Sequence, residues 1–350
     1  MFAIEANQPE CLAINEYVLH GTGDPKAALD GIYFWTWNTE EVLGMIEWMR
    51  AWNADPTHAK KVQFLGFDMQ TSNVAHDRVA SYLGRVAPAA AASLLTPIGA
   101  VGTSASASVI GKQTPDERKH LTDGLTAIAK AFDTSRKAWA QQTSPAELDE
   151  VRHDVTILQQ ATEMYAAAAA GTGGFNVRDT SMAANIQWIL EHQPAGTRMV
   201  VWAHNGHIAN RIGAGNGTLI NMGSHLRRQL KTSYVNLGFV FSQGSFQAIE
   251  MKGGPRGGSL NEITLGDPPE SNASVAFART GKPLLVLDLR ALPRQGAVHD
   301  WFAAPHPLRD TGAVFSTEKN MTSAEILPEL YDAVIFVDKT TRARPIHPRK

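Results

Sequence analysis

Several features that would fix the class of a protein at once are scarce in this sequence. Cys11 is the single cysteine among 350 residues, so no disulfide can form within the chain, and a reducing compartment is expected. No apolar run reaches the ~18 residues that a membrane-spanning helix needs, and the N-terminus lacks the basic start and apolar core of a signal peptide. We therefore expect a cytoplasmic protein without a membrane partner.

Neither sign of charge dominates. The 32 Lys+Arg and 34 Asp+Glu residues give a net charge of −2, with no block of like charge. The sequence therefore lacks the cluster of positive charge that is typical of a protein with a nucleic-acid partner. Hydrophobic residues make up 43% of the chain, enough for a large buried core. This composition favours a protein that acts on a small, fairly neutral molecule, and it leaves the oligomeric state open.

Four common catalytic signatures are also missing. The sequence contains no G-x-S-x-G, G-x-x-x-x-G-K-[ST], H-E-x-x-H or G-x-G-x-x-G pattern. These absences argue against an α/β-hydrolase with a serine nucleophile, a P-loop ATPase, a zincin and a Rossmann dehydrogenase. We expect no cofactor.

Short apolar runs rich in β-formers alternate with helical periodicity over much of the chain. This order implies right-handed crossovers, and hence an α/β fold with a mostly parallel sheet flanked by helices. Strand signals vanish over residues 74–172, where apolar residues recur at helical spacing. We therefore predict a single domain over residues 1–350 with a large helical insertion at 74–172. Strands are predicted at residues 2–4, 62–67, 199–203, 234–241, 284–289 and 333–337.

Polar residues follow three of these predicted strands. In parallel sheets, ligands collect beyond the carboxyl ends of the strands, where Glu5, Asp68 and His204 would lie. His204 and His207 stand three residues apart, and both can act there as proton donors or hydrogen-bonding electrophiles. Alternatively, one histidine caps a turn and the other is solvated. Two histidines are fewer than the three or four ligands that zinc usually needs, so no metal is expected.

Other candidates have two interpretations each. Glu5 must be paired, hydrogen-bonded or protonated if it is buried, and can orient a water or a histidine; alternatively it is an exposed terminal residue. Arg178 can bind a substrate oxygen or Glu5, and Asp179 is interpreted as a helix cap. The aromatic run of residues 33–37 is either packed core or the lining of a pocket for a bulky apolar ligand. The substrate-binding candidates are Tyr33, Trp35, Trp37, Asp68 and Asn205.

Five segments occur in an order that resembles one known family. They are Phe2–Ala6, Trp35–Val42, Gly66–Gln70, Arg178-Asp179 and Trp202–His207. Together they resemble the erythromycin esterase family, whose members hydrolyse the lactone of 14-membered macrolides. The resemblance covers nearly the whole chain.

The resemblance implies a set of catalytic residues and a reaction. Glu5, Arg178, His204 and His207 match site residues of the family. The implied reaction is attack of an activated water on an ester carbonyl, without a covalent serine. The substrate expected from it is a small-molecule ester.

The start of the chain departs from the family pattern. Family members carry a strand and a G-E-x-T-H-G-like turn ahead of the strand that ends at Glu5, and the histidine of that turn is the presumed general base. Here the first strand begins at Phe2. We therefore expect the domain to be incomplete at its N-terminus and its esterase activity to be weak or absent, because losing a general base commonly costs about 10²–10⁴-fold in rate.

Two other functions remain open. One is a non-catalytic protein that binds a macrolide-like ligand. The other, weaker one is a metal-dependent hydrolase that uses His204 and His207 with Glu5.

Overall fold

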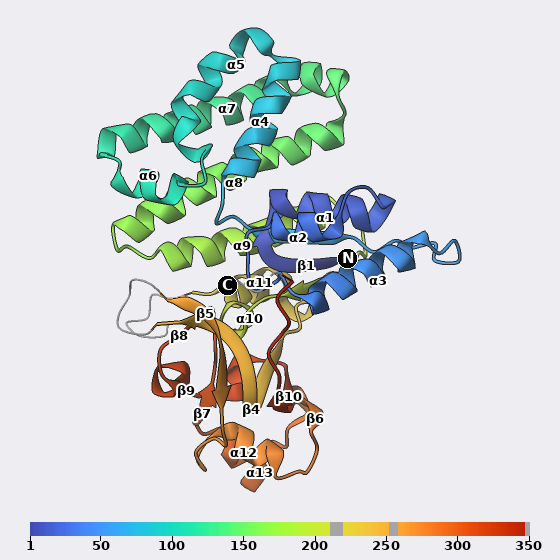
Figure 1. Ribbon diagram of the computed structural model, residues 1–350, viewed down its shortest axis with the longest axis vertical. Helices are drawn as coiled ribbons and strands as arrows, with labels where there is room; N and C mark the ends of the chain where they lie inside the picture. Colours follow the sequence, from blue (N-terminus) through green and yellow to red (C-terminus); the bar gives the residue numbers. More distant parts are fainter. Residues whose placement is uncertain (211–219, 252–257, 347–350) are drawn as a thin grey trace. The chain divides into compact units, whose positions relative to one another are not determined.

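The computed structural model describes residues 1–210, 220–251 and 258–346. The contacts divide the chain into two compact units, each built from two segments. The first unit comprises Met1–Gly23 and Pro56–Val201, and the second comprises Asp24–Asp55 and Trp202–Lys350. Figure 1 shows strands and helices in both. The predicted α/β class, with parallel strand pairs and a large helical insertion, is confirmed, whereas the single domain over residues 1–350 stays a prediction.

A small sheet organises the first unit. Its strands are β1 (Phe2–Asn7), β2 (Phe64–Asp68) and β3 (Val200–Trp202), in the order β2-β1-β3. β1 and β2 are parallel, so their carboxyl ends share one edge, and Glu5 and Asp68 lie near it. The strands meet closely at Gly66, where a Cβ atom would lie 2.4 Å from a backbone oxygen of β1. Only glycine fits this position without a shift of the backbone.

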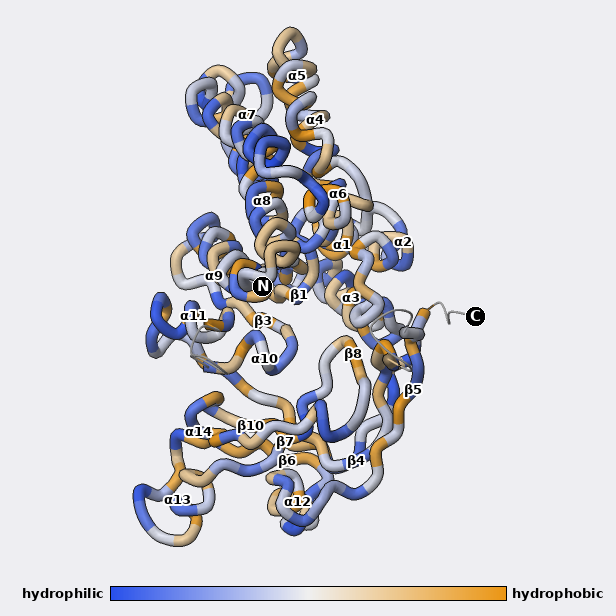
Figure 2. Tube along the Cα trace, turned by 90° about the vertical axis from the view of Figure 1, so that its left-hand side faces the viewer, coloured by the Kyte–Doolittle hydropathy of each residue, from blue (hydrophilic) through white to orange (hydrophobic). Residues whose placement is uncertain are grey.

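Helices make up the rest of the first unit. The α7 N-terminus is fixed by a reciprocal pair of bonds between Thr114 and Glu117. In the core of the insertion Tyr82 stacks on Phe132 and both rings meet Trp139 edge-on, with ring centroids 5.1–6.2 Å apart. Figure 2 shows hydrophobic and hydrophilic stretches alternating along these helices. The helices are α1 (Gln8–His20), α4 (Asn73–Val86), α5 (Pro88–Leu95), η1 (Thr96–Val101), α6 (Ser106–Lys112), α7 (Pro115–Gln142), α8 (Pro145–Ala169) and α9 (Gly174–Glu191).

The interpretation of Asp179 as a helix cap is wrong. α9 begins at Gly174, and Gly173 stands at its N-cap in the left-handed conformation with φ 99°. Glycine adopts this conformation without a steric penalty, so Gly173 can occupy the N-cap position. The helix therefore begins at Gly174, before Asp179. Asp179 and Arg178 therefore lie inside the helix, and Asp179 is buried.

A second sheet organises the second unit, in the order β5-β4-β10-β6 with β8 paired to β4. β4 pairs in parallel with β10 and β8, whereas β4–β5 and β10–β6 are antiparallel. β7 and β9 form a separate antiparallel pair. The strands are β4 (Leu237–Glu250), β5 (Ser259–Leu265), β6 (Leu284–Asp288), β7 (His306–Arg309), β8 (Val314–Phe315), β9 (Thr322–Glu325) and β10 (Ala333–Thr340).

Helices make up the rest of the second unit. α12 covers one face of the sheet, where the ring centroids of Phe277 and of Phe336 on β10 lie 5.6 Å apart. On the opposite face, Phe239 of β4 and Val286 of β6 are 50% and 68% exposed. The helices are α2 (Pro25–Asp30), α3 (Glu40–Ala54), α10 (Asn205–Ile208), α11 (Met222–Leu230), η2 (Lys231–Ser233), α12 (Ala273–Ala278), η3 (Leu289–Ala291), α13 (Ala297–Phe302), η4 (Glu318–Met321) and α14 (Leu327–Leu330).

The sequence predicted the strands of both units as members of one sheet, whereas the structure divides them between two. A local reason lies at the edge of β4. There the Asn205 side chain bonds both backbone groups of Phe239, and so occupies the place of a neighbouring strand.

Within the described ranges, no single helix has the length and apolar character to cross a bilayer, although Pro88–Val101 and Ser106–Lys112 pass that test together as a pair bent by 88°.

Candidate functional site

Arg178 of α9 joins two carboxylates in the first unit. Its Nη2 atom lies 2.7 Å from Glu5 Oε1 and 2.7 Å from Asp68 Oδ2. The contact with Glu5 is one of the two alternatives that the sequence left open. Burial by itself lowers the pKa of Arg178, but its ion pairs with Asp68 and Glu5 outweigh that effect and raise the pKa above its ordinary value. The side chains of Arg178 and Glu5 are 12% and 15% exposed, so this charge cluster reaches the surface.

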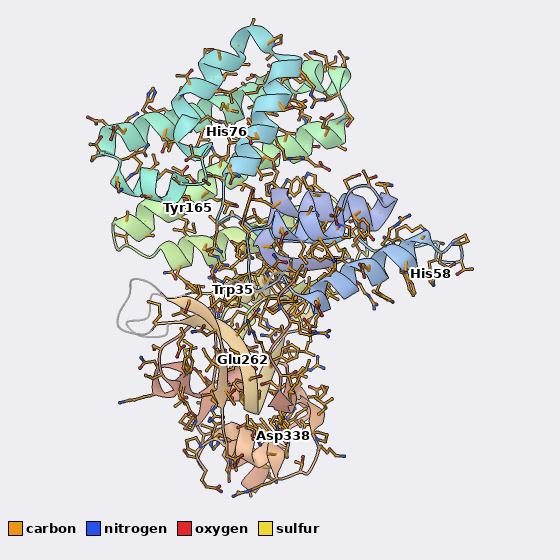
Figure 3. The ribbon with its side chains drawn as sticks, in the orientation of Figure 1. Trp35, His58, His76, Tyr165, Glu262 and Asp338 are labelled. Atoms are coloured by element: carbon orange, nitrogen blue, oxygen red, sulfur yellow. The ribbon has the colours of Figure 1, made fainter. Side chains whose placement is uncertain are left out.

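Asp68 is fixed from several sides. Its carboxylate is fully buried and accepts hydrogen bonds from the Met69 N–H and the Gln70 side chain at 2.8 and 2.9 Å. Gln70 is held in turn, because its backbone carbonyl accepts a hydrogen bond from the hydroxyl of Tyr165, which lies on α8 (Figure 3). Asp68 therefore orients Arg178 directly, and its predicted contact with a substrate stays a prediction.

A second group of buried acids lies in the same unit and was missed by the sequence analysis. Glu10 accepts bonds from Thr71 and from Asn7, and burial raises its pKa to about 7. Its Oε2 atom has no hydrogen-bond partner among the described residues. Burial also raises the pKa of Asp154 to about 7, although Arg78 lies 2.7 Å away. The signal for Glu10 was present, since it occupies the same buried face of α1 as Ile14 and Val18.

His204 is held at both ring nitrogens in the second unit. It stands at the N-cap of α10, where its Nδ1 accepts the Gly206 N–H at 3.0 Å. Its Nε2 lies 3.1 Å from the Thr311 carbonyl oxygen and 3.3 Å from Asp310 Oδ1. Asp310 and Thr311 follow β7 and were not among the predicted residues.

The rest of the histidine segment is mainly enclosed. His207 is only 5% exposed, and its ring centroid lies 6.4 Å from that of His204. The alternative in which one histidine caps and the other is solvated is therefore half right: His204 caps, whereas His207 is buried. The Asn205 amide is bonded to the backbone of Phe239, at 2.7 and 2.9 Å.

His204 and Asn205 line a pocket of about 280 Å³ in the second unit. Its lining combines three phenylalanines with the polar residues 309–311. The lining residues are Ala203, His204, Asn205, Phe239, Phe241, Phe246, Gln247, Arg309, Asp310, Thr311 and Thr340.

The predicted aromatic run takes no part in this pocket. Trp37 is buried and packs edge-on against Trp202 with ring centroids 4.9 Å apart, so it is a core residue. Tyr33 is 61% exposed and has a positive φ of 61°, and Trp35 is half-buried. Their roles as substrate-binding residues stay predictions. In the part of the chain that the structure describes, no group of three or more His, Cys, Asp or Glu residues is arranged to hold a metal ion.

Known proteins match this chain over nearly its full length. Erythromycin esterase type II of Escherichia coli is 21% identical over 373 residues, which cover 99% of this chain and 83% of that protein. Putative hydrolase YbfO of Bacillus subtilis is 21% identical over 345 residues, covering 91% of this chain and 72% of that protein.

Solved structures share the fold. A Bacillus cereus protein superposes with a TM-score of 0.84 at 21% identity, covering 99% of this chain and 82% of its own. A succinoglycan biosynthesis protein gives 0.79 at 22% identity, with coverages of 98% and 80%. An erythromycin esterase mutant in its open conformation gives 0.68 at 16% identity, with coverages of 97% and 82%.

The family relationship rests on a match longer than any single motif. The model of the family described as erythromycin esterase matches residues 1–340. The chain belongs to the erythromycin esterase family.

Proposed function

We propose that the chain is a hydrolase that cleaves an ester or lactone of a bulky substrate of the macrolide type. The observation that carries this proposal is the match of the erythromycin esterase model over residues 1–340. The pocket beside His204 supports it, because an apolar wall with a few polar groups suits a bulky ligand with one reacting ester.

The chemistry needs two kinds of group. Attack of water on an ester requires removal of a proton from that water and stabilisation of the charge that develops on the carbonyl oxygen. We assign the orientation and deprotonation of the water to the Glu5 carboxylate, which is paired with Arg178. In the first unit Arg178 is a permanent cation, and in the second unit His204 and His207 offer imidazole groups; each is a candidate for stabilising that charge.

Mass spectrometry of erythromycin incubated with the purified chain tests the proposal. The expected product has gained one water, and both His204→Ala and Glu5→Gln abolish or strongly slow its formation. His299→Ala is the matched control, because His299 is an exposed histidine that also pairs with a carboxylate, at 3.0 Å from Asp300. If folded chain hydrolyses neither erythromycin nor a panel of other bulky esters, the proposal is wrong.

A second candidate is a protein that binds a macrolide-like ligand without hydrolysing it. The observation that favours it is that both ring nitrogens of His204 already have partners within the protein. In that case erythromycin raises the melting temperature by mass action and is recovered unchanged. Absence of any thermal shift at high ligand concentration would remove this candidate.

A further inference from the structure

We infer that Asp310 is a positioning residue for His204, and that it keeps the imidazole in the form that carries its proton on Nε2. In this form the N–H on Nε2 donates to Asp310 and to the Thr311 carbonyl, and Nε2 does not take a proton from water. The inference rests on the proposed function, which it makes more specific by excluding His204 as the base that takes a proton from water.

The first argument comes from the Nδ1 side of the ring. The Gly206 backbone N–H lies 3.0 Å from Nδ1, and a backbone N–H can only donate. Nδ1 must therefore offer its lone pair. Since a neutral imidazole carries one proton, that proton is on Nε2.

The second argument comes independently from the Nε2 side. The Thr311 carbonyl oxygen lies 3.1 Å from Nε2 and Asp310 Oδ1 lies 3.3 Å from it. A carbonyl and a carboxylate only accept hydrogen bonds, so both require a proton on Nε2. Three groups on opposite sides of the ring thus favour the same tautomer.

The loop that supplies these acceptors is anchored in the second unit. Arg309 is 2% exposed, and its guanidinium donates to the Gly266 carbonyl at 2.9 Å and to Glu318 Oε1 at 2.8 Å. The Asp310 N–H is bonded to the Met321 carbonyl at 2.8 Å. Because its neighbour and its own backbone are held, Asp310 presents its carboxylate at a fixed place beside His204.

Both side chains remain accessible from the pocket, since His204 and Asp310 are each 34% exposed. A nitrogen that carries a proton cannot remove one from water, so another group must do so. Asp310 and the Thr311 carbonyl then determine the direction in which the Nε2–H points.

Nuclear magnetic resonance of protein labelled with 15N-histidine tests the tautomer without any substrate. Long-range 1H–15N correlations distinguish the two neutral forms, and the signals of His204 are those lost in His204→Gln. We expect Nε2–H in the wild type and an Nε2 proton that exchanges with water faster in Asp310→Ala. An Nδ1–H tautomer in the wild type would overturn the inference.

Kinetics of erythromycin opening test the role of Asp310. For Asp310→Ala we expect kcat to fall by about 10- to 100-fold with KM little changed, the range typical when a partner that orients a metal-ligating histidine is removed. Asp310→Asn keeps an acceptor oxygen and should retain most of the activity. The matched control is Asp300→Asn, which alters an exposed carboxylate 3.0 Å from another histidine and should change nothing.

The results separate the two ideas. If the wild type does not open erythromycin but shows the Nε2–H tautomer, with faster exchange in Asp310→Ala, the proposed function fails and the positioning role stands. If the wild type is active and Asp310→Ala changes neither kcat nor the exchange of the Nε2 proton, the positioning role is wrong and the proposed function stands.

Discussion

Replacing Glu10 with glutamine removes a buried carboxyl group whose ionisation opposes folding. Glu10 is 5% exposed, and burial raises its pKa from 4.5 to about 7. Glutamine keeps the oxygen that accepts from Thr71 and Asn7, and it cannot ionise. The substitution therefore changes the charge of the group with little change in its shape.

The sign follows from the direction of the pKa change. The pKa of Glu10 is higher in the folded state than in the unfolded state. Its contribution to the free energy of unfolding is therefore complete below about pH 4.5 and is lost as the pH rises through about 7. Raising the pKa from 4.5 to about 7 corresponds to about 3 kcal/mol, at about 1.4 kcal/mol for each pKa unit. Relative to Glu10→Gln, the wild type should lose about this much free energy of unfolding between about pH 4.5 and pH 8.

Neighbouring groups make the comparison between variants necessary. Burial raises the pKa of Asp154 to about 7, which adds a loss in the same direction. Burial also lowers the pKa of His153 to about 3, so its contribution is present above pH 6.5 and is lost as the pH falls. Both effects are shared by the wild type and Glu10→Gln, so they cancel in the difference, apart from the repulsion by which Asp154 itself helps to raise the pKa of Glu10.

Urea denaturation at several pH values between about 4.5 and 8 measures this difference. Glu16→Gln is the control, because Glu16 lies on the same helix and is exposed; its profile should run parallel to that of the wild type. The reasoning is refuted if the Glu10→Gln profile is also parallel to the wild type, because ionisation of Glu10 would then not be coupled to folding.

Two further changes test the packing of the first unit by urea unfolding. Arg178→Met leaves the fully buried carboxylate of Asp68 without its counter-ion and should cost about 3–5 kcal/mol. Arg290→Met, in an exposed ion pair, should leave stability unchanged, and equal effects of the two would contradict the importance of burial. Gly66→Ala should cost about 3 kcal/mol, because its Cβ atom would lie 2.4 Å from a backbone oxygen. Gly44→Ala, in open space on helix α3, should stabilise the chain by about 0.5–1 kcal/mol; a harmless Gly66→Ala would refute the close contact.

Features encoded by neighbouring residues were predictable from the sequence. The apolar runs that end at Glu5 and Asp68 form parallel strands, so their carboxyl ends, and with them the two carboxylates, lie close together. The pairing of Arg178 with Glu5 was one of two alternatives, because a buried carboxylate needs a partner. The start of α9 was misplaced, since the left-handed glycine that begins it gives no signal distinct from other turn glycines.

Features that join distant segments were not predictable in the same way. Asp310 lies more than a hundred residues beyond His204, and its side chain is placed by contacts of Arg309 with β4 and with the segments around Gly266 and Glu318. No periodicity or local motif records such a placement. The same holds for Asn205, whose amide is bonded to the backbone of Phe239, 34 residues further along the chain.

The outer strand of the second sheet bears on how copies of the chain behave in concentrated solution. β6 is the last strand in the sheet order, and its Leu284 and Val286 are 66% and 68% exposed. An apolar edge of this kind is a template on which another chain can add a strand. Here Pro283 precedes the strand and the exposed Asp288 ends it, so only five residues are available for pairing. Proline and charge at the two ends therefore limit the growth of a shared sheet between copies.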